Sequence, residues 1–248
     1  MFSLPVFLGV AVVIAITSFL SGLFGMAGGM ILMGVLLAFL PVPIAMVLHA
    51  ITQMASNGWR AVLWYKYIDA RIFFRYGLGA ALALAIWWLI QFVPPKPVAL
   101  IALGLTPLMA RLIPRHHAPN VARPWHGFVC GLVCCSLQMM AGVSGPILDV
   151  FFVNAGLDRR HIVATKAASQ TLGHFSKLIY FGALVEKTGN IDPWVAAMAV
   201  AMAIVGTTAS RRALEAMSDV QWRTWTWRII TAAATVYLVQ GVWLLIPV

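Results

Sequence analysis

The first 59 residues of the chain contain no Asp, Glu, Lys or Arg, and this stretch severely limits what the chain can fold into. Hydrophobic residues make up 62% of the 248 residues, charged residues make up 10%, and the mean hydropathy is +0.91. A water-soluble domain could not cover so much apolar surface. Four further uncharged runs are each about long enough to cross a bilayer core of roughly 30 Å. They are 77–95, 124–148, 193–210 and 229–248. We therefore expect an all-α polytopic membrane protein.

The basic residues gather between the apolar runs, in four short connections. These groups are Lys66, Arg71 and Arg75; Arg111, Arg115 and Arg123; Arg159 and Arg160; and Arg211, Arg212, Arg223 and Arg228. The positive-inside rule predicts that all four connections face the cytoplasm, with both termini on the other side. The net charge of +10 then reflects membrane topology and not nucleic-acid binding. The first five residues contain no basic n-region, so we expect the first helix to stay as an anchor and not to be cleaved as a signal peptide.

One polar pattern occurs twice inside apolar helices. His49, Gln53, Asn57 and Arg60 are followed 117 positions later by Lys166, Gln170, His174 and Lys177. The spacing i, i+4, i+8, i+11 keeps all four side chains on one helix face. We call these sets the first and second polar ladders. Two facing ladders of cationic and amide side chains predict a binding site for a small anion.

The rest of the chain is duplicated with the same order of elements. In the first half, a helix near 4–23 leads into a glycine-rich break and a short helix to Leu40, and spans follow near 44–65, 72–92 and 98–112. In the second half, a helix near 125–140 leads into a break and a short helix to Phe152, and spans follow near 160–184, 193–209 and 225–246. We expect two repeats, 1–120 and 121–248, that form one membrane domain.

The residues before each ladder helix predict the relative orientation of the repeats. The first ladder helix follows an uncharged Pro-Val-Pro segment, whereas the second follows Asp158, Arg159 and Arg160. The two helices should therefore enter the membrane from opposite sides, which makes the repeats inverted and brings both breaks toward the midplane. A parallel duplication with both breaks on one side stays open, because hydropathy does not distinguish a re-entrant hairpin from two spanning helices.

The breaks resemble those of a known transporter family. The segment Gly22-Leu-Phe-Gly-Met-Ala-Gly-Gly29, its partner Gly142-Val-Ser-Gly-Pro146 and the duplicated halves are similar to the sulfite exporter TauE/SafE family, also called the 4-toluene sulfonate uptake permease family. The second break departs from a fully glycine-rich pattern at Val143 and Ser144. The resemblance covers nearly the whole chain. It implies a multi-pass protein of the bacterial inner membrane that moves sulfite, sulfonates, sulfoacetate or related organosulfur anions.

The chemistry of the residues agrees with an oxyanion as substrate. A short helix that starts at Gly28-Gly29 or Ser144-Gly145 directs free N–H groups and its positive dipole end toward a ligand. The ladders add amide, imidazole and cationic donors. Cations are costly inside a bilayer, and an anionic partner is the economical explanation of why they persist there. The predicted substrate-binding residues are His49, Gln53, Asn57, Arg60, Lys166, Gln170, His174, Lys177, Gly28, Gly29, Ser144 and Gly145.

Structural roles compete with this interpretation. Arg60, Lys166 and Lys177 lie toward the ends of their spans and could extend to the interface. The two ladder histidines could serve helix packing, as could the glycines.

Asp149 is the only acidic residue predicted within the membrane. It could carry a proton that is coupled to anion movement, since a buried carboxylate takes up protons more readily. It could instead be the counter-ion of Lys166 or Arg60 in the empty protein. We favour the counter-ion.

These features predict a secondary transporter that works by alternating access between the two halves. An uncoupled anion channel with the same site is the alternative. An intramembrane enzyme with His49 or His174 as base lacks a nucleophile or metal partner, and Cys130, Cys134 and Cys135 are best explained by packing. We expect a small anion and the lipid bilayer as partners, with no nucleic acid, cofactor or metal. A homodimer stays open.

Overall fold

The computed structural model describes residues 4–185 and 191–246 of the chain. This part consists of ten α-helices and two short 3-10 helices, with no strand, which confirms the all-helical class. The first five helices are α1 (Leu4–Phe24), α2 (Met26–Phe39), α3 (Val42–Leu63), α4 (Ala70–Ile90) and α5 (Lys96–Leu112). The other five are α6 (Pro124–Ala141), α7 (Gly145–Phe152), α8 (Arg159–Val185), α9 (Pro193–Ala216) and α10 (Asp219–Trp243). The 3-10 helices are η1 (Tyr65–Tyr67) and η2 (Arg115–His117).

Glycine conformation produces both helix breaks. Gly25 separates α1 from α2 with a φ of 67°, and Gly142 ends α6 with a φ of 79°. Side chains with a Cβ rarely adopt this left-handed region, so glycine is the residue that can turn the chain here. Each break is followed by a helix too short to span a bilayer alone, at 14 residues in α2 and 8 residues in α7.

The predicted connection between residues 209 and 225 is wrong in its extent. Helix α9 continues to Ala216 and α10 already begins at Asp219. Ser218 caps α10, and its side chain and that of Gln221 form a reciprocal capping box. Arg211 and Arg212 therefore belong to α9, and Arg223 and Arg228 belong to α10. Hydropathy detects where apolar residues stop, and these helices continue beyond that point.

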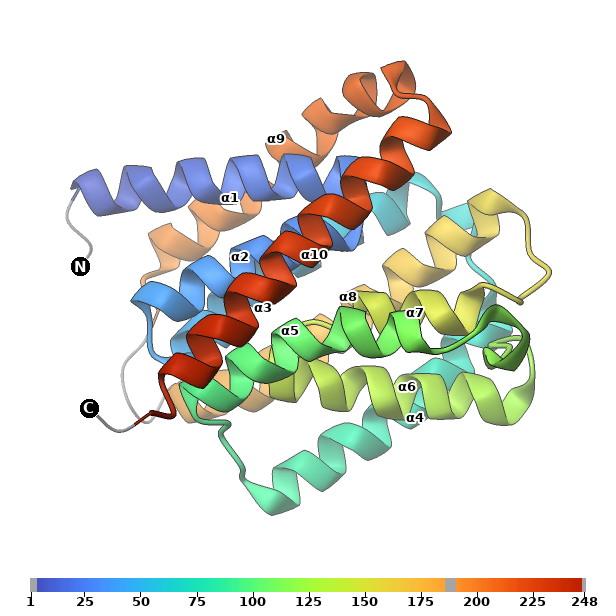
Figure 1. Cartoon of the computed structure of the whole chain (residues 1–248), viewed down its shortest axis with the longest axis horizontal. Coiled ribbons are helices and arrows are strands. Elements are labelled where there is room, and N and C mark those ends of the chain that lie inside the picture. Colours follow the sequence, from blue (N-terminus) through green and yellow to red (C-terminus); the bar gives the residue numbers. More distant parts are fainter. Residues whose placement is uncertain (1–3, 186–190, 247–248) are drawn as a thin grey trace.

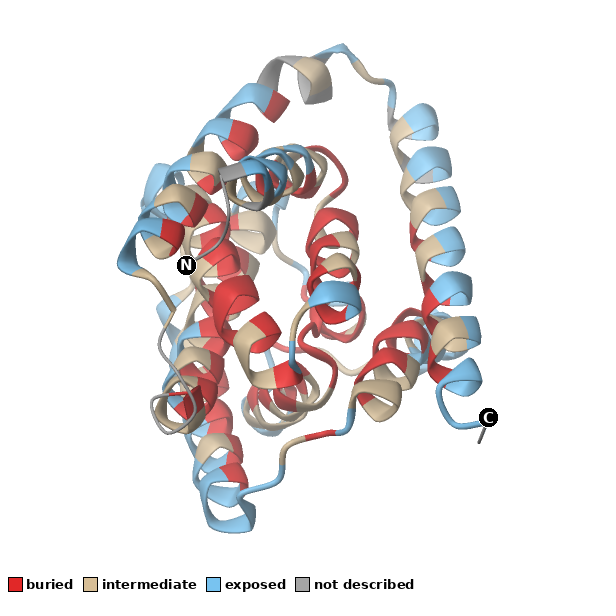
Figure 2. Cartoon of the chain, turned by 90° about the vertical axis from the view of Figure 1, so that its left-hand side faces the viewer, coloured by how far each residue is buried: buried red, intermediate tan, exposed pale blue. Residues whose placement is uncertain are grey.

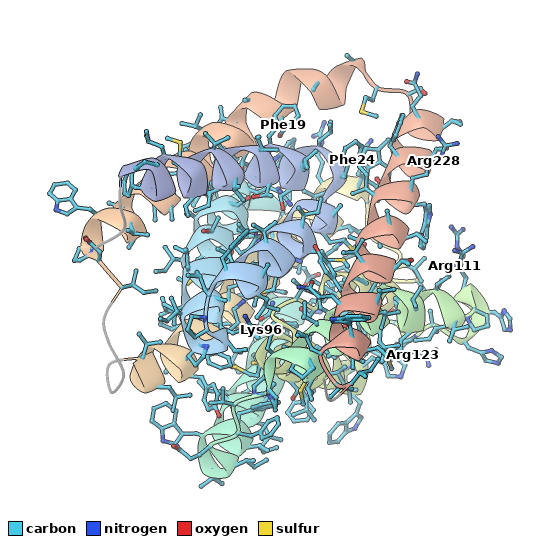
Figure 3. The ribbon with its side chains drawn as sticks, turned by 60° about the vertical axis from the view of Figure 1, so that its left-hand side comes forward. Phe19, Phe24, Lys96, Arg111, Arg123 and Arg228 are labelled. Carbon is cyan, nitrogen blue, oxygen red and sulfur yellow. The ribbon has the colours of Figure 1, made fainter. Side chains whose placement is uncertain are left out.

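All four basic segments nevertheless meet at one end of the molecule, on the right of Figure 1. Contacts between segments distant in sequence tie this end together. Arg160 Nη1 donates to the Tyr67 hydroxyl at 3.0 Å, Asn154 Nδ2 donates to the Arg115 carbonyl at 2.6 Å, and the Arg111 guanidinium lies 5.4 Å from the Trp227 ring. Figure 3 shows Arg111, Arg123 and Arg228 on this side, whereas Lys96 lies near the middle of that view. We call it the basic end.

The first five helices pack against the last five. Helix α1 packs along α9 and α4 along α6, while α3 packs on α8 and α5 on α10. Buried residues concentrate inside the bundle and the outward helix faces are exposed (Figure 2). Many outward residues are large and apolar: Leu8, Val12 and Ile16 on one face of α1 are 55 to 57% exposed. Such a surface suits lipid and not water.

Length and composition identify three membrane-spanning helices among the described residues. They are Phe7–Phe24, Ala70–Ile90 and Pro193–Ser210. Helix α2 is a further, shorter apolar helix. Three helices of this length and composition support a multi-pass membrane protein.

Candidate functional site

The two polar ladders face each other in reversed order, because α3 and α8 run antiparallel. At one end, the Lys177 ammonium of the second ladder lies 2.8 Å from His49 Nδ1 of the first. At the other end of the pair, Ala61 packs against Ala167 and Ala168. The last position of the second ladder thus meets the first position of the other. The His49 and His174 rings add an edge-on contact with centroids 5.4 Å apart.

A chain of hydrogen bonds links the two glycine breaks through the ladders. Lys177 Nζ donates to the Gly142 carbonyl at 2.9 Å and to His49 Nδ1 at 2.8 Å. Since His49 Nδ1 accepts this bond, Nε2 carries the ring hydrogen, and it donates to the Gly29 carbonyl at 2.9 Å. Gly142 lies at the second break and Gly29 in the first turn of α2. These hydrogen bonds therefore connect the first half of the chain to the second.

Each ladder glutamine lies against the glycine of its own short helix. A Cβ on Gly29 would be 3.2 Å from Gln53 Oε1, and a Cβ on Gly145 would be 3.3 Å from Gln170 Nε2. The two helix starts also approach each other, since a Cβ on Gly145 would be 2.7 Å from the Met26 Cβ. Neither start has a side-chain cap on its free N–H groups. Two positive helix ends and two amides therefore converge.

Two of the three ladder cations bind backbone carbonyls beside the breaks. Arg60 Nη2 donates to the Ser21 carbonyl at 3.2 Å, as Lys177 does to that of Gly142. Lys177 is 0% exposed, so it does not extend to the interface. Its two acceptors are neutral, and within the described part of the chain it forms no ion pair. The ammonium has three hydrogens and uses two of them here, which leaves donor capacity for an anion.

Lys166 forms an ion pair with Asp149 on α7. This contact agrees with the prediction that Asp149 is a counter-ion of Lys166. Their side chains are 24% and 40% exposed, so this part of the ladder is more open than the Lys177 end.

Several buried polar atoms near the ladders have no hydrogen-bond partner. They are Gln53 Nε2, His174 Nδ1, Ser144 Oγ, Ser169 Oγ, and both Nε2 and Oε1 of Gln138. Each unpaired buried group costs about 1–3 kcal/mol, so native proteins keep few of them. Their position around the ladders indicates a surface prepared for a polar ligand.

Gln138 was missed by the sequence analysis. Its side chain is 0% exposed and lies over Gly173, where any Cβ would collide with Gln138 Oε1. The residue precedes Gly142 by one helical turn and donates no side-chain hydrogen bond. A single amide side chain in an apolar helix beside a break could have identified Gln138 as a candidate site residue. The repeated pattern does not include it, because position 21, which is 117 positions earlier, is Ser.

Two of the predicted binding residues, Asn57 and Gly28, contact neighbouring protein groups. Asn57 Nδ2 donates to the Gln53 carbonyl at 3.0 Å and to Gln53 Oε1 at 3.3 Å, which orients the amide of Gln53. Gly28 lies against α1, where a Cβ would collide with the Thr17 carbonyl and Ser21. Its contact matches the helix-packing alternative.

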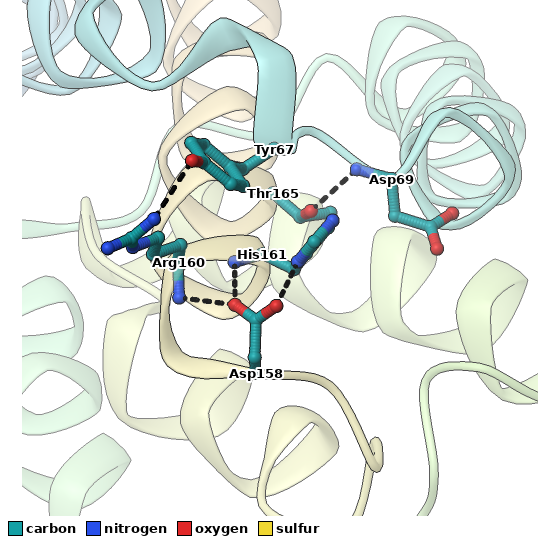
Figure 4. Close-up of polar contacts among 6 residues, drawn as sticks. All are labelled: Tyr67, Asp69, Asp158, Arg160, His161 and Thr165. Carbon is teal, nitrogen blue, oxygen red and sulfur yellow. Dashed lines mark hydrogen bonds and ion pairs between the residues drawn. The ribbon is translucent and has the colours of Figure 1, made fainter.

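A separate set of polar contacts joins the start of α8 to the α3–α4 connection at the basic end (Figure 4). We call this set the basic-end clasp. Asp158 accepts from the backbone N–H of Arg160 at 2.8 Å and from the His161 ring at 2.6 Å, and Thr165 Oγ1 accepts from the Asp69 N–H at 2.9 Å. Hydrogen bonds from the backbone and the ring of His161 hold the pKa of the Asp158 carboxyl below its ordinary value.

The site favours binding over bond-breaking chemistry. It provides ammonium, guanidinium, imidazole, amide and backbone N–H donors, which suit the oxygens of a small anion. Within residues 4–185 and 191–246, no three His, Cys, Asp or Glu side chains lie close enough to hold a metal ion. The three cysteines are buried free thiols.

Comparison with known proteins gives a direct result. The sequence model of the sulfite exporter TauE/SafE family matches residues 10–245, which is nearly the whole chain. Searches of the curated proteins and of the solved structures found no match. The family match confirms the resemblance seen in the glycine breaks and duplicated halves, and the chain belongs to the sulfite exporter TauE/SafE family.

Proposed function

We propose that the chain is a secondary transporter of a small sulfur oxyanion or organosulfur anion, such as sulfite, a sulfonate or sulfoacetate. The observation that carries this proposal is the hydrogen-bond chain from Gly142 through Lys177 and His49 to Gly29. It places donors from both halves at one buried point. The family description, sulfite export, supports the same class of substrate.

The proposed substrate position lies beside the two short-helix starts. Gln53 and Gln170 flank it, and Lys177 supplies charge from one end of the ladders. A sulfite or sulfonate group has three oxygens and needs several convergent donors. Since the lysine and the orphan amides are buried without an ionic partner, an anion satisfies them at the lowest cost in free energy.

The proposed mechanism is alternating access between two inverted repeats, 1–120 and 121–248, in the inner membrane. The reversed order of the ladders and the reciprocal packing of α1 on α9 and α6 on α4 support the inverted arrangement. The gathering of basic segments at one end supports a cytoplasmic position for that end and non-cytoplasmic termini. The hydrogen-bond chain then has to open and re-form as the site changes the side to which it is accessible.

A binding screen followed by a flux assay tests the proposal. Purified protein in detergent is heated with sulfite, thiosulfate, sulfoacetate, isethionate or taurine, and with carboxylate analogues. We expect the melting temperature to rise with at least one sulfur oxyanion and less with its carboxylate analogue. Proteoliposomes preloaded with that anion should then show counterflow of labelled substrate.

The controls distinguish a carrier from a channel, and loss of a binding residue from a general effect of substitution. A variant with Gln53→Leu and Gln170→Leu should lose both the thermal shift and counterflow, whereas Gln240→Leu on α10 should keep both. Conductance without counterflow would identify an uncoupled channel. No response to any anion would contradict the proposed substrate class.

A further inference from the structure

A cavity of about 460 Å³ opens at the basic end, and no residue of the polar ladders lines it. Its polar lining consists of imidazole, guanidinium and amide side chains: His116, His117, Asn120, Arg123, His126 and Asn154. None of the lining residues is acidic. The cavity thus combines a positive guanidinium with several hydrogen-bond donors and is free of a built-in counter-ion.

The loop that forms the cavity is held by hydrogen bonds to α4, to α7 and to a residue just after α7. Asn154, just after α7, donates to the carbonyls of Arg115 and Ala118 at 2.6 and 3.2 Å. The Val121 N–H donates to the Phe151 carbonyl at 3.0 Å, and Arg75 on α4 donates to the Ala122 carbonyl at 2.9 Å. These bonds fix the loop before any ligand arrives, which lowers the entropic cost of binding.

His126 is oriented to donate. Its Nδ1 lies 2.9 Å from the Asn120 backbone nitrogen and 3.2 Å from the Asn120 carbonyl oxygen. In the tautomer in which Nδ1 accepts the shorter bond, Nε2 carries the ring hydrogen and can donate to a ligand. His126 is also in the first turn of α6, where Arg123 is the N-cap residue and no side chain satisfies the free N–H groups. The helix start and the Arg123 guanidinium therefore place positive charge on the same rim.

Exposed apolar residues next to the cavity indicate where its ligand comes from. Leu112 is 80% exposed and Trp125 is 76% exposed, and they precede and follow the loop. A tryptophan at a helix end beside basic residues is typical of the lipid interface. Basic pockets at this level of membrane proteins suit phospholipid headgroups.

We propose that this cavity binds a phosphate oxyanion supplied by the headgroup of an anionic phospholipid. Arg123 and His126 contact the phosphate oxygens, and the acyl chains lie along Leu112 and Trp125. The proposal does not depend on the identity of the transported anion.

Native mass spectrometry of the full-length protein tests the proposal. Phosphatidylglycerol and phosphatidylcholine are titrated in separate arms, and inorganic phosphate is added as a competitor in a third. We expect phosphatidylglycerol to bind in preference to phosphatidylcholine. Combined Arg123→Gln and His126→Gln changes should weaken that binding about tenfold, because charge-assisted hydrogen bonds are lost. Arg228→Gln, an exposed arginine at the same end, should change little (Figure 3).

A further variant guards against a folding defect. Arg123→Gln alone removes an exposed side chain and should leave the melting temperature unchanged while it weakens phosphatidylglycerol binding; Arg123→Lys should restore part of it. Phosphate that binds at Arg123 without any lipid binding there would overturn the headgroup as the source. Unchanged lipid binding in the folded double variant would overturn the whole proposal.

Discussion

Lys177 donates a hydrogen bond to His49 at 2.8 Å although 128 positions separate them. The contact joins the second ladder to the first and leaves a buried ammonium with neutral acceptors only. An ionisable residue held in this way within a membrane protein is a candidate for the transport site.

Replacing Lys177 with Met should abolish anion binding while the protein still folds. Methionine fills a similar volume and removes the buried charge, but it leaves no donor for the anion or for His49. We expect the sulfite-dependent thermal shift to disappear and uptake into proteoliposomes to fall at least about tenfold. Lys66→Met, at an exposed lysine, is the matched control. Normal uptake by the Lys177 variant would remove this residue from the site.

Gln53 and Gln170 should contribute equally to binding. Each lies against the first-turn glycine of its own short helix, and the two contacts match in distance. Loss of one neutral hydrogen bond is worth about 1 kcal/mol, so each Gln→Leu change should weaken binding about fivefold. The measurement is isothermal titration with the anion that the screen identifies. A strong effect at one position with none at the other would contradict a shared site.

Hydropathy and charge predicted most of the helix positions to within a few residues. The helix breaks could be predicted because each needs a residue with positive φ, and glycine is the residue that adopts it readily. Gly25 and Gly142 are these residues in the structure. The α9–α10 region differed because Arg211 and Arg223 bound the apolar runs but do not end the helices. A capped helix such as α10 can extend beyond its apolar run.

The ladders were visible in the sequence but their partners were not. Periodicity identifies the face of a helix, whereas the bond between Lys177 and Gly142 depends on how α8 packs against the α6–α7 break. The burial of Gln138 beside Gly173 likewise depends on the close approach of α6 to α8. No local pattern encodes such approaches, so sequence supplied candidate residues and the structure supplied their contacts.

Replacing Gln138 with Met should stabilise the empty protein and impair transport. The amide is fully buried with both polar atoms unpaired, and removing it should gain about 1–3 kcal/mol. The melting temperature without ligand should therefore rise, while the anion-dependent shift and uptake fall. Gln240→Met makes the same chemical change on α10 and should do neither. Higher stability with normal uptake would show that Gln138 is a packing residue only.

The basic-end clasp should weaken in acid. The folded-state pKa of Asp158 lies below its ordinary value of 3.8, so its hydrogen bonds stabilise the clasp fully above that pH. They are lost as the pH falls through the lowered folded-state pKa. Hydrogen exchange at the amides of Arg160 and His161, corrected for intrinsic rates, should be slow at neutral pH and faster in acid. In Asp158→Ala, exchange at these amides should be fast at neutral pH and in acid.

A comparable residue at the other end provides the control for the clasp. Asp192 accepts from the Trp194 N–H at the start of α9. Asp192→Ala should speed exchange at that helix start and leave Arg160 and His161 protected. Equal protection of the α8 amides in wild type and in Asp158→Ala would contradict the capping role of Asp158.

Asp149→Asn distinguishes a counter-ion from a proton carrier. The ion pair with Lys166 gives this ladder cation an internal carboxylate as its partner. Without that carboxylate, Lys166 is available, so we expect tighter anion binding and lower stability of the empty protein. Uptake measured in vesicles with an imposed pH gradient should respond to the gradient as the wild type does. Asp192→Asn should match wild type in every assay. If the variant still transports but no longer responds to the gradient, Asp149 carries the coupled proton, because asparagine keeps the shape of the side chain and cannot titrate.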